Sequence, residues 1–135
     1  MSHITKLKVE IKDLECLKLA CESLGLELNE NQKTYKWYGS QPKKCDHAIS
    51  VAGNNKAYEV GVMKKDDIFE MEADFWNGGY GLEELAGSNC GKVMEAYGQE
   101  VAMKTATEFA NAEGWSVDRS WDTETSETVI KLTKY

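Results

Sequence analysis

Four cysteines, two histidines and a glycine-rich segment are the features of this 135-residue sequence with the most obvious chemical potential. Cys90 is the best candidate for a reactive thiol, because it precedes a predicted helix and a helix N-terminus lowers the pKa of a cysteine. A thiolate nucleophile also needs a base, and no spacing brings His3 or His47 beside Cys90. We therefore expect an ordinary loop or buried cysteine, with a reactive Cys90 as the less favoured alternative, and we assign no catalytic residue.

Cys45-Asp46-His47 is a second group of potential ligands. Zinc sites pair ligands two to four residues apart and use four in total, whereas a single residue separates Cys45 from His47. We expect no metal and no cofactor here. Whether His3, Cys45, His47 and Cys90 come together is left open. No Cys-x-x-Cys pair is present, so we expect reduced thiols.

The segment 77–91 contains five glycines. Its end, Gly87-Ser88-Asn89-Cys90-Gly91-Lys92, resembles a phosphate-binding loop, because the amides of a following helix can hold an anion. A P-loop has four residues between its glycines and Ser or Thr after the lysine, whereas three residues and Val93 stand here. We expect a flexible helix start. The alternative is a small-molecule or nucleotide pocket beside this segment.

Periodicity indicates an α+β framework. Strand-like alternation occurs at 6–11, 26–28, 34–38, 47–51, 58–63, 68–75, 115–121 and 128–134, with a loop at 39–44. Helical spacing runs from Leu14 to Leu24, between the N-cap candidate Asp13 and Gly25, and from Val93 to Ala112 before Gly114. We predict a single domain over residues 1–135, with a mainly antiparallel sheet of about five to seven strands and two helices on one face.

The predicted strand at 68–75 indicates that one face of this sheet is wet. Its apolar residues Phe69, Met71, Ala73 and Phe75 alternate with the acidic residues Glu70, Glu72 and Asp74. Exposed Trp and Tyr beside charged residues are typical of protein contact surfaces. We predict such a surface at Tyr35, Trp37, Glu70, Glu72, Asp74 and Trp76. For the acidic stripe taken alone, we favour a solvated face with cross-strand lysine pairs over a site for hydroxyl-rich or cationic partners.

The charge and hydropathy of the chain argue against nucleic acid and membranes as partners. Sixteen Lys plus Arg stand against 23 Asp plus Glu, for a net charge of −7, and Arg119 is the only arginine. Nucleic-acid binding draws on clustered Lys and Arg, so we expect none. Charged residues interrupt every apolar run, and no apolar stretch follows the start Met1–Lys6, so we expect neither membrane insertion nor export. We expect a cytoplasmic protein.

Several segments resemble a known family. They are Met1-Ser2-His3-Ile4, Leu7–Ile11, Asp13–Leu17, Leu24-Gly25, Tyr58–Gly61, Ala73–Trp76, the helix that carries Tyr97, and Glu113–Val117. On these residues the chain resembles the domain of unknown function 1257 family of cyanobacteria, phages and plastids, where it is a hypothetical chloroplast reading frame. The resemblance implies a bacterial cell, a phage-infected cell or the plastid stroma, and it implies no activity.

No residue set supports acid–base, nucleophilic or metal chemistry well enough to favour an enzyme. The leading hypothesis is a non-enzymatic protein-binding or adaptor module that uses an open sheet face and an unidentified protein partner. The alternative is the small-molecule or nucleotide-binding protein with its pocket beside 77–91. Self-association into a homo-oligomer is left open.

Overall fold

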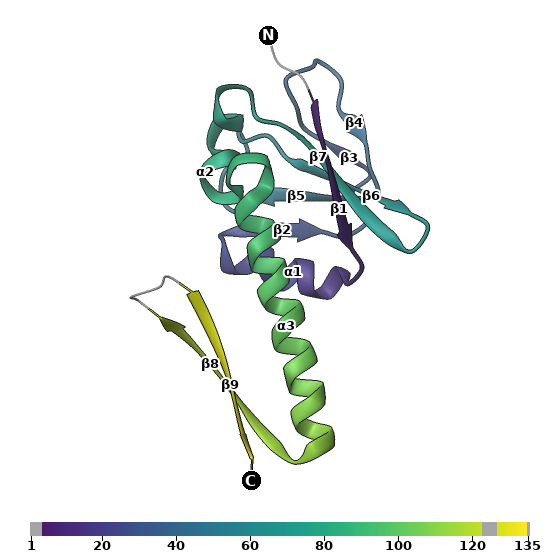
Figure 1. Cartoon of the computed structure of the whole chain (residues 1–135). Helices are drawn as coiled ribbons and strands as arrows, with labels where there is room; N and C mark the ends of the chain where they lie inside the picture. Colours follow the sequence, from purple (N-terminus) through teal and green to yellow (C-terminus); the bar gives the residue numbers. More distant parts are fainter. Residues whose placement is uncertain (1–3, 123–126, 135) are drawn as a thin grey trace.

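A curled antiparallel sheet of five strands forms the centre of the protein, in the order β1-β7-β6-β5-β2 (Figure 1). The computed structural model describes residues 4–122 and 127–134. The α+β fold with an antiparallel sheet and two main helices confirms the prediction. The strands of this sheet are β1 (Ile4–Ile11), β2 (Leu26–Asn29), β5 (His47–Val51), β6 (Val60–Lys65) and β7 (Ile68–Asp74).

The two main helices begin and end within two residues of the predicted positions. The side chain of Asp13 caps α1 (Leu14–Ser23) by accepting from the Cys16 amide, and Gly25 follows with a φ of 79°. Gly114, with a φ of 72°, ends α3 (Gly91–Glu113). No helix in the described part of the chain has an apolar stretch long enough to cross a bilayer.

Between β7 and α3 the chain forms three short elements that the sequence did not predict. They are the 3₁₀ turn η1 (Trp76–Gly81), the helix α2 (Leu82–Ala86) and the 3₁₀ turn η2 (Ser88–Cys90). Each is too short to show a hydrophobic period, and glycines separate them. Segment 77–91 is therefore folded against the core, with Leu82, Ala86 and Cys90 fully buried.

One side of the sheet forms the main core with the helices. We call it the helix-side core. Strands supply Val60, Val62 and Met71, α1 supplies Leu17, and α3 supplies Val93, all exposed by 1% or less. This burial is the chief source of stability for a chain of this size.

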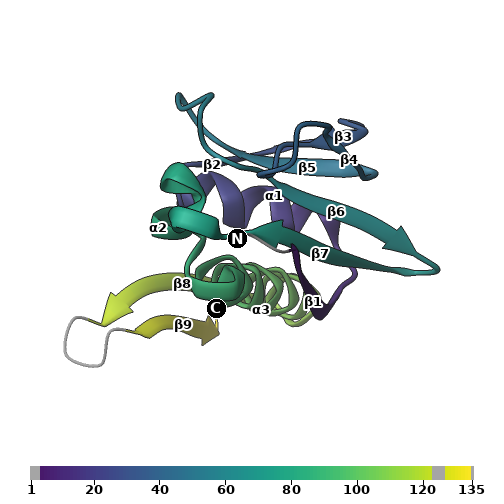
Figure 2. The same ribbon diagram turned by 90° about the horizontal axis from the view of Figure 1, so that it is seen from above.

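A short hairpin covers part of the other side of the sheet. It is formed by β3 (Thr34–Tyr35) and β4 (Lys43–Lys44), which lie on the side of β5 away from α1 (Figure 2). Tyr35, Cys45 and Ala48 are buried there together. The predicted strand at 34–38 is thus shorter than expected, and part of the predicted loop at 39–44 is a strand. The prediction of an uncovered wet face is wrong at this end of the sheet, because the hairpin packs on it.

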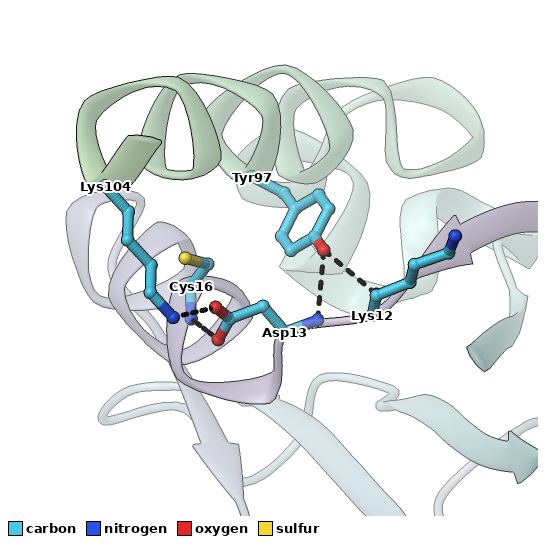
Figure 3. Close-up of polar contacts among 5 residues, drawn as sticks. All are labelled: Lys12, Asp13, Cys16, Tyr97 and Lys104. Carbon is cyan, nitrogen blue, oxygen red and sulfur yellow. Dashed lines mark hydrogen bonds and ion pairs between the residues drawn. The ribbon is translucent and has the colours of Figure 1, made fainter. Parts of the chain in front are cut away.

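A polar network joins the start of α1 to α3 (Figure 3). The hydroxyl of Tyr97 accepts hydrogen bonds from the backbone amides of Lys12 (3.0 Å) and Asp13 (3.2 Å). The ammonium of Lys104 donates to Oδ2 of Asp13 at 2.5 Å, while Oδ1 accepts from the Cys16 amide at 3.1 Å. Two turns of α3 therefore hold the point at which β1 passes into α1.

The last two strands form a separate antiparallel hairpin. β8 (Trp115–Asp122) and β9 (Glu127–Lys134) pair from Trp115 opposite Lys134 to Asp122 opposite Glu127. The strands predicted at 115–121 and 128–134 are confirmed. This hairpin contacts α3 and lies beside the half of that helix that extends past the sheet (Figure 1).

Replacing Gly61 should destabilise the fold. Gly61 lies in β6 beneath the Tyr35 ring, and a methyl group there would come within 2.4 Å of two ring carbons. We expect Gly61→Ala to lower the free energy of unfolding by about 1–3 kcal/mol, as overpacking does. Gly98→Ala is the matched control, because Gly98 lies in α3 with open space around it, so we expect a gain of about 0.5–1 kcal/mol. Urea unfolding measures both, and an unchanged midpoint for Gly61→Ala would contradict this packing.

Asp13 should give the fold an acid-sensitive contribution. The Lys104 ammonium, with help from the Cys16 amide, lowers the pKa of Asp13 from 3.8 to about 2. A lowered folded-state pKa stabilises the fold fully above the unfolded-state pKa, and this stabilisation disappears as the pH falls through the folded-state value. Asp13→Asn keeps a capping side chain but loses the charge. We expect the stability difference between wild type and Asp13→Asn to shrink between about pH 4 and pH 2, measured by urea unfolding with Glu15→Gln as control. A difference that stays constant over this range would refute the assignment.

Candidate functional site

Four aromatic side chains form a continuous row at the end of β7. Tyr38 and Trp76 have ring centroids 5.0 Å apart, Trp76 and Tyr80 are 6.0 Å apart, and Tyr80 and Tyr58 are 5.1 Å apart. Neighbouring ring planes are inclined by 54° to 70°. We call these four side chains the aromatic row.

The aromatic row concentrates exposed apolar surface at one place. Tyr38, Trp76 and Tyr80 are 55%, 36% and 44% exposed, and they are three of the five large apolar side chains that are exposed in the described part of the chain. The fourth member, Tyr58, is buried at the inner end. Burial raises the pKa of its hydroxyl, and the neighbouring Tyr80 acts in the same direction. The exposed rings thus rest on a buried one.

The carboxylate of Asp74 lies buried under the aromatic row and fixes two of its members. Its Oδ2 accepts from the backbone amide of Tyr38 at 3.1 Å, and its Oδ1 accepts from that of Trp76 at 2.9 Å. The side chain is completely buried. A buried carboxylate is tolerated only when hydrogen-bond donors replace its water. Asp74 therefore holds the loop after β3 against the start of η1.

A left-handed turn places Tyr80 in the row. Asn77, Gly78, Gly79 and Tyr80 have φ values of 52°, 66°, 61° and 54°. This conformation costs a residue other than glycine about 1–2 kcal/mol, and consecutive examples are rare. The turn is held from outside, because the Tyr58 amide donates to the Gly79 carbonyl at 2.9 Å and the Asn54 side chain donates to the Tyr80 carbonyl at 3.3 Å. Strained backbone that the surroundings hold in place is typical of functional sites.

Two of the six residues predicted to form a contact surface are not exposed. Tyr35 is fully buried, and its hydroxyl donates to Oε1 of Glu72 at 2.7 Å. Burial, reinforced by Glu72, raises the pKa of Tyr35. Asp74 is buried as well. The prediction of an exposed face is wrong for Tyr35 and Asp74, because the β3–β4 hairpin covers both.

The remaining predicted residues have different surroundings. Trp76 is exposed in the aromatic row, as predicted. The indole of Trp37 donates to the Gln41 carbonyl at 2.6 Å, and the Lys43 ammonium lies 5.2 Å above its ring, so Trp37 is engaged within its own loop. Glu70 pairs with Lys65 at 3.5 Å, which is the cross-strand ion pairing favoured for the acidic stripe.

Sequence reasoning missed Tyr38, Tyr58 and Tyr80 as members of one surface. Tyr38 and Tyr58 were assigned to strands, whereas both lie outside the strands of the structure. Tyr80 is the only residue with a side chain in Gly78-Gly79-Tyr80-Gly81. An aromatic residue held between glycines was the available signal, since glycines permit the left-handed backbone that presents it.

The thiol of Cys90 is not activated in this structure. Cys90 occupies the N-cap position of α3 with a φ of 59°, but its side chain makes no capping hydrogen bond and is fully buried in the helix-side core. Burial raises the pKa of Cys90 to about 12, which is opposite to the lowering that makes a helix-terminal cysteine reactive. The prediction of an ordinary buried cysteine fits this placement. All four cysteines are free and buried.

The other potential ligands are not brought together. Cys45 belongs to the cluster on the opposite side of the sheet from Cys90, and its thiol donates to the Gln32 carbonyl at 3.2 Å. Nδ1 of His47 accepts from the Asn31 amide at 2.9 Å. His3 lies outside the described residues. Within residues 4–122 and 127–134, no group of three His, Cys, Asp or Glu side chains is placed to hold a metal ion.

Two polar hollows adjoin the left-handed turn. One has a volume of about 510 Å³ and is lined by turn residues together with Glu83, Glu84 and Lys92. The other, of about 500 Å³, is lined by Asn54, Lys36 and Glu59 among others. Neither of these two hollows is lined by a cysteine or a histidine.

Comparisons with protein-family models, with curated proteins and with solved structures give no match for this chain. The resemblance to the domain of unknown function 1257 family stays a prediction. The function must therefore be inferred from the geometry of the site.

Removing the Asp74 carboxylate should loosen the aromatic row. In Asp74→Ala the amides of Tyr38 and Trp76 lose their acceptor, so we expect a loss of about 1–3 kcal/mol in the free energy of unfolding and faster hydrogen exchange at both amides. Glu70→Ala, on the same strand, removes only a surface ion pair and should cost under about 1 kcal/mol. Equal effects of the two variants on stability and on exchange would contradict the role assigned to Asp74.

Proposed function

We propose that the protein is a non-enzymatic protein-binding module and that the aromatic row is its contact surface. The single observation that carries this proposal is the exposure of three adjacent aromatic rings, Tyr38, Trp76 and Tyr80, on a backbone that Asp74 and the left-handed turn fix in place. Trp and Tyr are the residues most enriched among those that contribute most of the binding energy at interfaces.

The fixed geometry supports binding in a second way. Association costs free energy when side chains and loops must be ordered at the interface. Here the loop that carries Tyr38 and the turn that carries Tyr80 are already hydrogen-bonded to Asp74 and to segment 54–58. Less ordering is therefore required when a partner covers the rings.

The described residues offer little support for catalysis. The buried carboxylate of Asp74 is occupied by two amides, and burial keeps Cys90 protonated at neutral pH. We also propose that the protein resembles the domain of unknown function 1257 family. On this resemblance, it acts in the cytoplasm of a bacterial or phage-infected cell or in the plastid stroma.

An affinity experiment tests the proposal. Wild type, Trp76→Ala and Leu19→Ala are immobilised, exposed to an extract of the source cells, and the retained proteins are quantified by mass spectrometry. Leu19 is the matched control, because its apolar side chain is 44% exposed on α1, outside the aromatic row. We expect at least one protein whose recovery falls about tenfold or more with Trp76→Ala and is unchanged with Leu19→Ala. If every retained protein is recovered equally with wild type and with Trp76→Ala, the proposal is overturned.

The second candidate is a small-molecule or nucleotide-binding protein. The hollow of about 510 Å³ beside the left-handed turn favours it, because Glu83, Glu84 and Lys92 offer polar groups around a concave surface. A small molecule that co-purifies with the wild type and is lost from Lys92→Ala would support this candidate.

A further inference from the structure

The position of the aromatic row restricts how a partner can bind it. The row lies at the end of β7, and both β6 and β7 are interior strands of the sheet. Their backbone groups are already paired, so a partner cannot add a strand at this place. Recognition must therefore come from side chains.

Charge and shape restrict the partner further. Recognition of a phosphorylated segment uses a cluster of arginines, and this chain has a single arginine, Arg119. An amphipathic helix needs an apolar groove, whereas the hollows beside the left-handed turn are lined by Asn54 and Lys36 on one side and by Glu83 and Glu84 on the other. The apolar surface is thus a narrow row with polar flanks.

We propose that the aromatic row binds a proline-rich segment in the polyproline II conformation, with Lys or Arg at one of its ends. This inference rests on the proposed function. Segments of this kind dock on exposed aromatic rings, and they rise about 3.1 Å per residue. This conformation has three residues per turn, so residues three positions apart face the same surface and are about 9 Å apart. The ring spacings of 5.0 Å from Tyr38 to Trp76 and 6.0 Å from Trp76 to Tyr80 give a row of up to about 11 Å, which is long enough to contact two such residues.

Hydrogen bonding fits the same partner. The Trp76 hydrogen bond within the described residues is made by its backbone amide, and the side chain is 36% exposed, which leaves the indole N–H for a partner. A polyproline II segment makes no internal hydrogen bonds, so its carbonyls are free to accept. Trp76 can therefore donate to the backbone of the partner while its ring packs against a proline.

The hollow of about 510 Å³ beside the left-handed turn offers negative charge for the basic end of the partner. Glu83 and Glu84 lie in α2, which begins shortly after the left-handed turn, and they line a hollow together with Gly78 of that turn and with Gly81. The Lys92 ammonium in the same hollow donates to the Glu84 backbone carbonyl at 3.0 Å. Two acidic residues and one lysine therefore line this hollow, and the excess of negative charge favours a basic residue in the partner.

Three synthetic peptides test the inference. The first has eight prolines and two C-terminal lysines, the second replaces the prolines with alternating Gly and Ser, and the third replaces the lysines with glutamates. Binding is followed by tryptophan fluorescence and by the NMR shift of the Trp76 indole N–H. We expect saturable binding of the first peptide, with affinity at least about tenfold lower for the Gly-Ser peptide and several-fold lower for the glutamate peptide.

Matched variants locate the site. Trp76→Ala should lower the affinity for the proline–lysine peptide about tenfold or more, and Leu19→Ala should leave this affinity unchanged. Tyr38→Ser is the second variant at the site, since a ring that is 55% exposed can be removed with little effect on folding. Glu84→Lys should lower the affinity for the peptide with C-terminal lysines several-fold and should raise the affinity for the peptide with C-terminal glutamates.

The outcomes separate this inference from the proposed function. Absence of saturable binding to the folded wild type, equal binding of the Gly-Ser peptide, or binding unaffected by both Trp76→Ala and Tyr38→Ser would each overturn the inference. If protein capture from the extract still depends on Trp76 in that case, the proposed function stands with a different kind of partner. If capture is independent of Trp76, the proposed function fails first.

Discussion

The buried carboxylate of Asp74 is the interaction on which the exposed surface of this protein depends. A fully buried carboxylate needs hydrogen-bond donors, and the backbone amides of Tyr38 and Trp76 supply them. Satisfying Asp74 therefore brings the loop of the β3–β4 hairpin to the end of β7. The same contact aligns two aromatic rings that are 38 positions apart in sequence number. The hydrogen bonds that satisfy the buried Asp74 carboxylate thus also hold the exposed rings of Tyr38 and Trp76 in place.

The left-handed turn adds a cost that other parts of the structure offset. Tyr80 has no intrinsic preference for its backbone conformation, but the Gly79 and Tyr80 carbonyls are held by Tyr58 and Asn54. The glycines on either side reduce the strain to two residues, Asn77 and Tyr80. These hydrogen bonds therefore hold the Tyr80 ring at a fixed place in the aromatic row.

The sequence predicted most of the framework, because the framework depends on local rules. Asp13, Gly25 and Gly114 mark helix ends through capping chemistry that needs no tertiary context. The candidate site was predicted poorly for the opposite reason. Whether Asp74 faces water or amides is decided by a hairpin more than 30 residues earlier, and the alternation of residues 68–75 is the same in both cases. Likewise Cys90 lies at the start of a helix, but its pKa is raised because its side chain is buried, and the spacing of residues in the sequence does not show which way that side chain points.

The order of strands has a consequence for biosynthesis. β1 and β2 are made first, and they become the two opposite edges of the sheet, with β5, β6 and β7 between them. Ile4 pairs with Asp74, so β1 has no strand partner until some 70 further residues have been translated. Pairings this distant in sequence close slowly. The nascent chain must therefore carry an unpaired N-terminal strand for several seconds, at translation rates of about 5–20 residues per second.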